Sequence, residues 1–269
     1  LAVAGFDAYR AAIRSDSTLW TWGAGSIIGD GTTADKSSPV QVPGSWSAVD
    51  IGYHAVAIKS DGTLWAWGYN GYGELGDGTT IDKSSPVQIG TSSWTAITAG
   101  LYHTLAVRSD GTLWAWGENN SGKLGDGTIA SKSSPVQIGT SSWTAMAAGS
   151  FASAAIRSDG ALFTWGSNGS GSVFGSLGDG TTVAKSSPVQ IGTSSWTAVA
   201  MNKYIAGVLV TAAIRKDGQL FTTGYAGTSI LYPGLGDGTT ITRSSFAAVG
   251  TLKWKTLRAG TGGFIGRLI

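Results

Sequence analysis

The sequence predicts an all-β protein built from four-stranded repeats, and three observations support this prediction. A glycine that ends an apolar segment recurs five times, at Gly23, Gly68, Gly117, Gly166 and Gly224. Gly-Asp-Gly-Thr follows each of these glycines, and Ser-Ser-Pro-Val-Gln then follows in four of the five repeats. The chain shows no convincing helical period in any 11-residue window. A period of roughly 50 residues with four strands per unit indicates a β-propeller of four-stranded blades.

The third repeat shows how each strand is predicted. Short apolar or alternating segments occur at Thr95–Gly100, His103–Arg108, Thr112–Gly117 and Ser134–Gly139, and Gly, Ser or Asp bounds each of them. Ser-Asp-Gly joins the second and third segments. Because Asp-Gly favours a tight two-residue hairpin in which both residues have positive φ, we expect such a turn here.

The strand count predicts five complete blades and half of a sixth in a single domain spanning residues 1–269. Residues 255–269 supply only a first strand, at Lys255–Gly260, and a second strand, at Phe264–Ile269. A closed ring needs two further strands for that blade, so we expect a segment upstream of Leu1 to supply them and to close six or seven blades. The predicted blades span approximately 1–46, 47–94, 95–143, 144–196 and 197–254, followed by the partial blade 255–269.

The cycle of motifs resembles the regulator of chromosome condensation repeat family. The resemblance rests on Leu101–Val107, Asp110–Gly117, Leu124–Gly127 and Pro135-Val136, and equivalent segments recur along essentially the whole chain. It implies a β-propeller, which typically has seven blades in this family. Members include a guanine-nucleotide exchange factor on chromatin and secreted β-lactamase inhibitory proteins. The property that they share is binding to protein surfaces, so the resemblance implies a protein partner and no enzyme activity.

Composition argues against several other classes of function. Charged residues make up only 13% of the chain and the net charge is +2, which does not fit a nucleic-acid-binding protein. The chain has no cysteine, and hence no disulfide framework and no thiolate metal site. No apolar run approaches the roughly 18 residues that span a bilayer, and the first residues lack the basic region of a signal peptide. We therefore expect neither nucleic-acid binding nor membrane insertion.

Four motifs that resemble chemical sites are better explained as structure. Gly71–Gly76 matches G-x-G-x-x-G, but the residues that follow open no helix, so no dinucleotide cofactor is expected. Two histidines at equivalent positions, His54 and His103, are too few for a metal site. One Asp in each Gly-Asp-Gly-Thr loop is expected to bond its own backbone and not to bind calcium. Trp65 and Trp67 lie on one face of a strand and are expected to pack in the core.

The candidate binding surface is the end of the repeats at which the loops differ. The loops between the first and second strands, and between the third and fourth, emerge at one end of a four-stranded meander and vary in length and content. We call this end the variable rim, and loops on a rigid scaffold commonly carry binding. Its candidate binding residues are Tyr53, His54, Tyr69, Tyr72, Tyr102, His103, Phe151, Phe174, Tyr204 and Tyr232.

These observations predict a non-enzymatic propeller that binds a protein partner through the variable rim. Low charge and repeated architecture favour a structural component of a virion or a cell surface, and therefore an extracellular or virion-surface location. The alternative is a lectin-like propeller that binds a cell-surface receptor or a glycan through the rim aromatics. The sequence predicts no cofactor and no metal.

Overall fold

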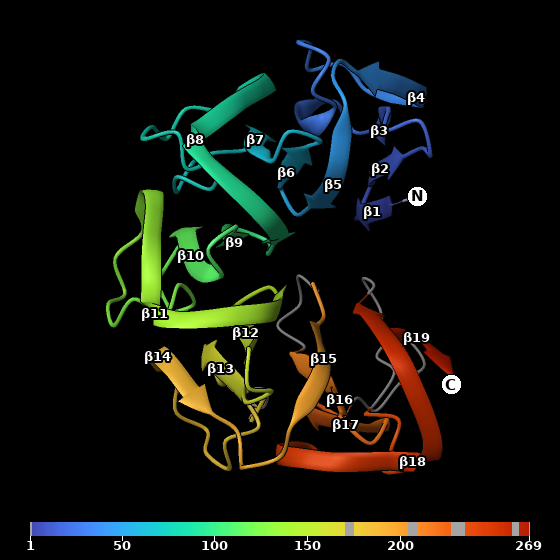
Figure 1. Cartoon of the computed structure of the whole chain (residues 1–269), viewed down its shortest axis with the longest axis vertical. Helices are drawn as coiled ribbons and strands as arrows, with labels where there is room; N and C mark the ends of the chain where they lie inside the picture. Colours follow the sequence, from blue (N-terminus) through green and yellow to red (C-terminus); the bar gives the residue numbers. More distant parts are fainter. Residues whose placement is uncertain (1, 170–174, 204–208, 227–234, 260–263, 269) are drawn as a thin grey trace. The chain divides into compact units, whose positions relative to one another are not determined.

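The computed structural model describes residues 2–169, 175–203, 209–226, 235–259 and 264–268, and these are almost entirely β-strands and connecting loops (Figure 1). The short 3₁₀ helix η1 (Gly25–Ile27) interrupts this pattern. No helix within these ranges is long and apolar enough to cross a bilayer. The prediction of an all-β protein is confirmed.

The strands pair in chain order as antiparallel meanders in three sheets. The first sheet contains β1 (Ala2–Phe6), β2 (Tyr9–Ile13), β3 (Leu19–Gly23) and β4 (Lys36–Val42). The second contains β5 (Trp46–Ile51), β6 (His54–Lys59), β7 (Thr63–Gly68), β8 (Lys83–Ala99), β9 (His103–Arg108), β10 (Thr112–Gly117), β11 (Lys132–Ala148), β12 (Ala152–Arg157), β13 (Leu162–Gly166) and β14 (Lys185–Gln190). The third contains β15 (Trp196–Met201), β16 (Val210–Arg215), β17 (Gln219–Gly224), β18 (Arg243–Ala259) and β19 (Phe264–Leu268).

Three long strands, β8, β11 and β18, each join the fourth strand of one repeat to the first strand of the next (Figure 1). In β8, Gln88 pairs back with Trp65 of β7, whereas Ala96 pairs forward with Val107 of β9. We expected a separate strand on each side of this connection. The chain instead turns without leaving the strand, and Gly90, with φ of +61°, supplies the left-handed residue near the corner.

The turn between the second and third strands also differs from the prediction. Asp61 does not have positive φ; only Gly62 does, at +85°. The N–H of Gly62 donates to the carbonyl of Lys59 at 2.9 Å. This is a three-residue connection, a type I turn followed by a left-handed glycine, and not the two-residue hairpin expected from Asp-Gly. In the first repeat Ser17 takes the glycine position, with φ of +66°.

The described residues form two compact units, which we call unit 1 (Leu1–Asn119 and Ala130–Thr140) and unit 2 (Asn120–Ile129 and Ser141–Ile269). Each unit has its own apolar core. In unit 1, Trp46 and Trp94 belong to two clusters of buried apolar side chains. In unit 2, Trp196 occupies the same position in the repeat and packs among Leu162, Ile191 and neighbouring residues.

The second tryptophan of the third strand connects successive repeats. Trp67, Trp116 and Trp165 are fully buried. Within unit 1, the indole N–H of Trp116 donates to the carbonyl of Glu74 in the preceding repeat at 2.8 Å, and that of Trp67 donates to the carbonyl of Ile27 at 3.0 Å. The prediction that the tryptophans are core residues is confirmed for Trp67. Trp65 is half-buried, and the ammonium of Lys59 covers its ring at 3.6 Å from the ring centroid.

Candidate binding rim

Four tyrosines of the variable rim meet in one cluster in unit 1, which we call the tyrosine cluster: Tyr53, Tyr69, Tyr72 and Tyr102. Tyr53 and Tyr102 stack with ring centroids 4.9 Å apart and an angle of 26° between the planes. Tyr72 meets Tyr102 edge to face at 5.9 Å, and Tyr69 meets it at 6.0 Å. Tyr72 is 43% exposed, and the other three rings are half-buried. The cluster therefore exposes the ring of Tyr72 to solvent, and the three less exposed rings pack around it.

Strand pairing explains why these tyrosines meet. His54, the first residue of β6, pairs with Gly68, the last residue of β7. The residues just outside this pair, Tyr53 and Tyr69, are therefore adjacent, and the N–H of Tyr69 donates to the carbonyl of Tyr53 at 3.2 Å. The next repeat uses the same arrangement, in which the N–H of Glu118 donates to the carbonyl of Tyr102 at 2.7 Å. The backbone thus holds the rim at equivalent positions in successive repeats.

Two carboxyl groups lie buried beside the tyrosine cluster. Glu74 is fully buried and Glu118 is 7% exposed. Oε2 of Glu74 accepts the N–H of Tyr72 at 2.9 Å. Burial, reinforced by the negative charges of Glu118 and Asp82, raises the pKa of Glu74 to about 7. Sequence reasoning missed Glu74, although the signal was present: no other repeat has an acidic residue two positions before its Gly-Asp-Gly.

The tyrosine hydroxyls respond to the same environment. Burial, together with the adjoining Tyr53, raises the pKa of Tyr102 to about 12. Burial and the carboxyl group of Glu74 also raise the pKa of Tyr69. The hydroxyl groups of Tyr69 and Tyr102 therefore stay protonated near neutral pH, whereas the carboxyl group of Glu74 titrates there.

The two histidines expected on the rim lie beneath it. His54 and His103 were predicted as binding residues of the rim, and both side chains are fully buried. Nε2 of His54 and the hydroxyl of Thr104 share a hydrogen bond of 2.6 Å, and that hydroxyl donates to the carbonyl of Glu74 at 2.9 Å. The two histidines are the first residues of β6 and β9, and their side chains pack inside the protein. This placement agrees with a structural role at the junction of loop and strand.

The remaining rim candidates fall in unit 2 or outside the described residues. Phe151 is half-buried, and the ammonium of the fully buried Lys123 lies 5.4 Å from its ring centroid. Lys123 occupies in its repeat the position that Glu74 occupies in the preceding one. Phe174, Tyr204 and Tyr232 lie outside the described residues.

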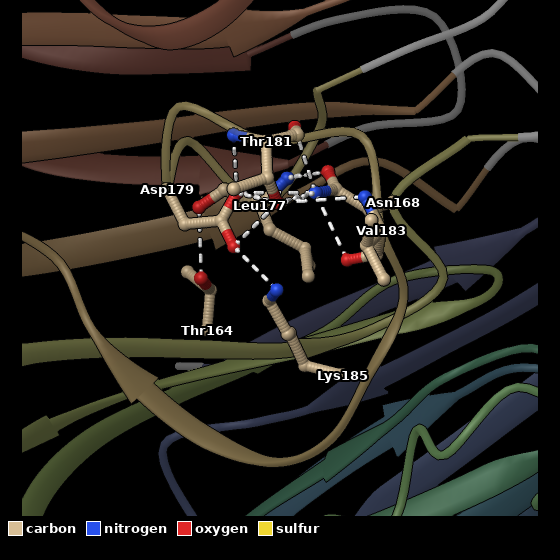
Figure 2. A network of polar contacts seen from close by, with 7 residues as sticks. All are labelled: Thr164, Asn168, Leu177, Asp179, Thr181, Val183 and Lys185. Carbon is tan, nitrogen blue, oxygen red and sulfur yellow. Dashed lines mark hydrogen bonds and ion pairs between the residues drawn. The ribbon is translucent and has the colours of Figure 1, made fainter.

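A buried asparagine fixes the loop that follows each of three third strands, and sequence reasoning missed it. Figure 2 shows this network around Asn168, whose side-chain oxygen accepts the N–H of Leu177 at 3.0 Å. Its amide donates to the carbonyl of Thr181 at 2.9 Å and to the carboxyl group of Asp179 at 3.1 Å. Asn70 makes the equivalent bonds in the tyrosine-bearing loop. The recurring Gly-x-Asn at Asn70, Asn119 and Asn168 was the available signal.

The aspartates of the repeats act in turns, as predicted. Oδ1 of Asp77 accepts both the N–H of Thr79, at 2.9 Å, and its hydroxyl, at 2.7 Å. Its second oxygen lies 3.6 Å from the ammonium of Lys83. Asp61 makes the same pair of bonds to Thr63, and these bonds lower the pKa of Asp61. The described residues contain no group of three or more histidine or acidic side chains placed to hold a metal ion.

Two family models match the central part of the chain. The regulator of chromosome condensation (RCC1) repeat matches residues 61–107 and 110–156, and a second model of the same repeat matches residues 94–123 and 143–172. A search of curated protein sequences finds no match.

Solved structures match along the whole chain. Human WBSCR16 matches with a TM-score of 0.80 and 18% identity, over 99% of this chain and 71% of that chain. Prp20p from Saccharomyces cerevisiae matches with a TM-score of 0.80 and 19% identity, over 100% of this chain and 68% of that chain. Yeast RCC1 (Prp20) bound to Kap60 matches with a TM-score of 0.79 and 16% identity, over 100% and 66%.

The extracellular or virion-surface location expected from the sequence is wrong in light of these matches. Prp20p is described with its binding to Gsp1p and histones, and yeast RCC1 is seen bound to Kap60. Together with WBSCR16, these relatives point away from the exterior of a cell or a virion. They likewise give no support to a virion component, a cell-surface receptor or a glycan ligand.

The sequence repeats, the antiparallel meanders and the structural matches all indicate the same fold. The family models cover Tyr69, Tyr72 and Tyr102 of the tyrosine cluster, and the solved structures extend the likeness to the rest of the chain. The chain is therefore an RCC1-type repeat β-propeller.

Proposed function

We propose that this chain is a non-enzymatic propeller that binds a protein partner through the tyrosine cluster of its variable rim. The observation that carries the proposal is the cluster itself. Four tyrosines from two successive repeats converge at the end where the loops differ, and Tyr72 is exposed to solvent. Tyrosine is enriched in the cores of protein interfaces because it offers a large apolar face and a polar hydroxyl.

The use of the charged residues favours a binding role over catalysis. Ten of the sixteen acidic residues fall in two repeated turn positions. Where described, they bond turn backbone and hydroxyl groups, as Asp61 and Asp77 do. Because these aspartates stabilise turns, we infer that binding involves the side chains that differ between repeats.

The structural relatives support the same class of function. Prp20p is described as binding Gsp1p and histones, and yeast RCC1 is seen in complex with Kap60. Each of these partners is a protein. The low sequence identity gives no basis for transferring any of them to this chain, so the partner is proposed only as a protein.

Removing the exposed ring tests the proposal. Tyr72→Ser deletes an exposed side chain that the core does not need. Leu252→Ser is the matched control, because Leu252 is 58% exposed and neighbours Lys253, which pairs with Gln219 at the opposite end of its meander. We expect a protein captured by the immobilised wild type from an extract of the source cells to be captured equally by Leu252→Ser. Tyr72→Ser should weaken that capture roughly fivefold or more.

Equal capture of every protein by the wild type and both variants would contradict the proposal. Thermal unfolding of the three proteins provides the control for folding. Leu252→Ser should unfold at the midpoint of the wild type, and Tyr72→Ser, which loses the ring contacts with Tyr69 and Tyr102, should lower the midpoint by about 2–4 °C at most.

A further inference from the structure

Glu74 is a buried carboxyl group that the described part of the chain leaves half satisfied. Oε2 accepts the N–H of Tyr72 at 2.9 Å, whereas Oε1 is buried and has no hydrogen-bond partner. No lysine or arginine among the described residues forms an ion pair with Glu74. Burying a carboxylate is costly unless a cation or several hydrogen-bond donors compensate it. Among the described residues, the side chain of Glu74 therefore lacks a positive partner.

The fold does not require an acid at this position. The carbonyl of Glu74 accepts the indole N–H of Trp116 and the hydroxyl of Thr104. In the next repeat the carbonyl of Lys123 accepts equivalent bonds, from Trp165 at 2.9 Å and from Ser153 at 2.7 Å. The first and fourth repeats place Ile27 and Ser176 there. The contacts between repeats use only the backbone carbonyl at this position. The presence of a buried carboxyl group on Glu74 therefore needs a separate explanation.

The tyrosine cluster supplies a second component of a cation site. Aromatic faces attract ammonium and guanidinium groups, most strongly where water is displaced. The same position in unit 2 already uses this geometry, because the ammonium of Lys123 lies 5.4 Å from the ring centroid of Phe151. In unit 1 the charges are reversed: aromatic rings line the position, and the buried side chain is acidic.

We propose that the tyrosine cluster, with Glu74 and Glu118 buried beside it, binds a lysine or arginine side chain presented by the protein partner. This inference rests on the proposed function and names the chemistry of the contact. The basic side chain enters beside the exposed Tyr72, packs against the rings of Tyr69 and Tyr102, and supplies the positive charge that Oε1 of Glu74 lacks.

Dependence on pH provides an additional test. The groups around Glu74 are Glu118, Asp82 and the tyrosines, with His54 and Thr104 bonded beneath its backbone. Because the pKa of Glu74 is raised to about 7, its ionised fraction grows between pH 6 and pH 8. If only the ionised form binds the cation, affinity should rise by up to roughly tenfold over this interval. A bound cation would in turn lower this pKa.

The experiment is a titration of the whole chain, ¹³C-labelled in its tyrosine rings, with N-acetyl-lysine amide. N-acetyl-norleucine amide, which has the aliphatic chain without the charge, is the matched probe. We expect saturable shifts of the Tyr72 and Tyr102 rings with the lysine probe, roughly tenfold weaker binding by Glu74→Gln, and no pH dependence in that variant. Glu74→Gln keeps the shape and the backbone bonds, so it should fold as the wild type does.

Asp61→Asn is the control for net charge. It removes one exposed negative charge in the turn between β6 and β7, five to six extended residues away from the rim, and Asn can accept the same turn bonds. It should bind the lysine probe as the wild type does. Equal binding of the norleucine probe, or undiminished lysine binding by Glu74→Gln, would overturn the inference. Because no protein partner is used, such a failure would leave the capture result, and the proposed function, standing.

Discussion

Ser17 shows how one residue departs from a repeated rule. It occupies, with φ of +66°, the position where the other four repeats place glycine, as at Gly62 with φ of +85°. A side chain in the left-handed region is strained by its own Cβ, and glycine is not. The first repeat therefore carries local strain that its neighbours lack.

We expect Ser17→Gly to stabilise the protein by about 0.5–1 kcal/mol, measured as the free energy of unfolding in urea. The reciprocal change, Gly62→Ser, should destabilise it by about 1 kcal/mol. An added Cβ at Gly62 would meet nothing closer than 3.6 Å, so the backbone conformation alone sets this cost. A loss of stability in Ser17→Gly would show that the Ser17 side chain contributes more than its strain costs.

Glu74 also differs from the equivalent residues of the other repeats, but in its side chain and not in its backbone conformation. Ser17 strains the backbone, whereas Glu74 places a carboxyl group in the protein interior, where burial is costly. The fold uses only the backbone carbonyl of Glu74, which accepts the indole N–H of Trp116. One buried position thus serves the architecture through its backbone and leaves its side chain available to distinguish one repeat from the next.

At the scale of the element, the rim loop depends on Asn70. The described bonds of this fully buried amide reach Thr79, Ile81 and Leu75 across the loop that carries Tyr72. Asn70→Ala leaves the N–H of Leu75 and two carbonyl groups without their partner. The variant should therefore lose about 2–3 kcal/mol of unfolding free energy.

Hydrogen exchange locates this effect. Protection of the amides in residues 71–79 should fall in Asn70→Ala, whereas the exposed Thr80→Ala, in the same loop, should change stability by less than about 0.5 kcal/mol. Unchanged protection in Asn70→Ala would mean that the glycine turns hold the loop without the asparagine.

The strands were predictable where apolar pattern and turn residues agree. β9 and β10 begin and end at the predicted residues, because Ser-Asp-Gly and the final glycine mark both ends. The turn type was not predictable in this way, since the same Asp-Gly serves two-residue and three-residue connections. The continuous strands β8, β11 and β18 were also missed. β8 and β11 contain Gly-Thr-Ser-Ser, which is typical of a break between strands, and β18 has Gly-Thr-Leu-Lys at the same position.

The meeting of the tyrosines was predictable from the sequence, whereas the other residues of the candidate site were predictable only in part. Meander topology correctly placed Tyr53, Tyr69, Tyr72 and Tyr102 at one end. It could not show that His54 and His103 turn inward, because strand alternation gives two faces without saying which one is covered. Glu74 was hidden by a different cause, since burial of a charged side chain runs against its usual exposure.

At the scale of the whole molecule, the repeated architecture and the proposed binding site use different chemical groups. Bonds such as that from Trp116 to Glu74 tie successive repeats through backbone carbonyls, which every residue type provides. The side chains at those positions are therefore free to vary without loss of the fold. The repeats of this propeller differ from one another in the side chains at these variable positions. Several such side chains lie close together in the tyrosine cluster.

The most direct test of the central claim is site-specific photocrosslinking with p-benzoylphenylalanine at position 72, with position 252 as the matched exposed control. If the tyrosine cluster binds the partner, irradiation in an extract of the source cells should attach one protein to position 72 and not to position 252. That adduct should fade when unlabelled wild-type chain competes. Attachment of the captured partner through position 252, with none through position 72, would contradict the account.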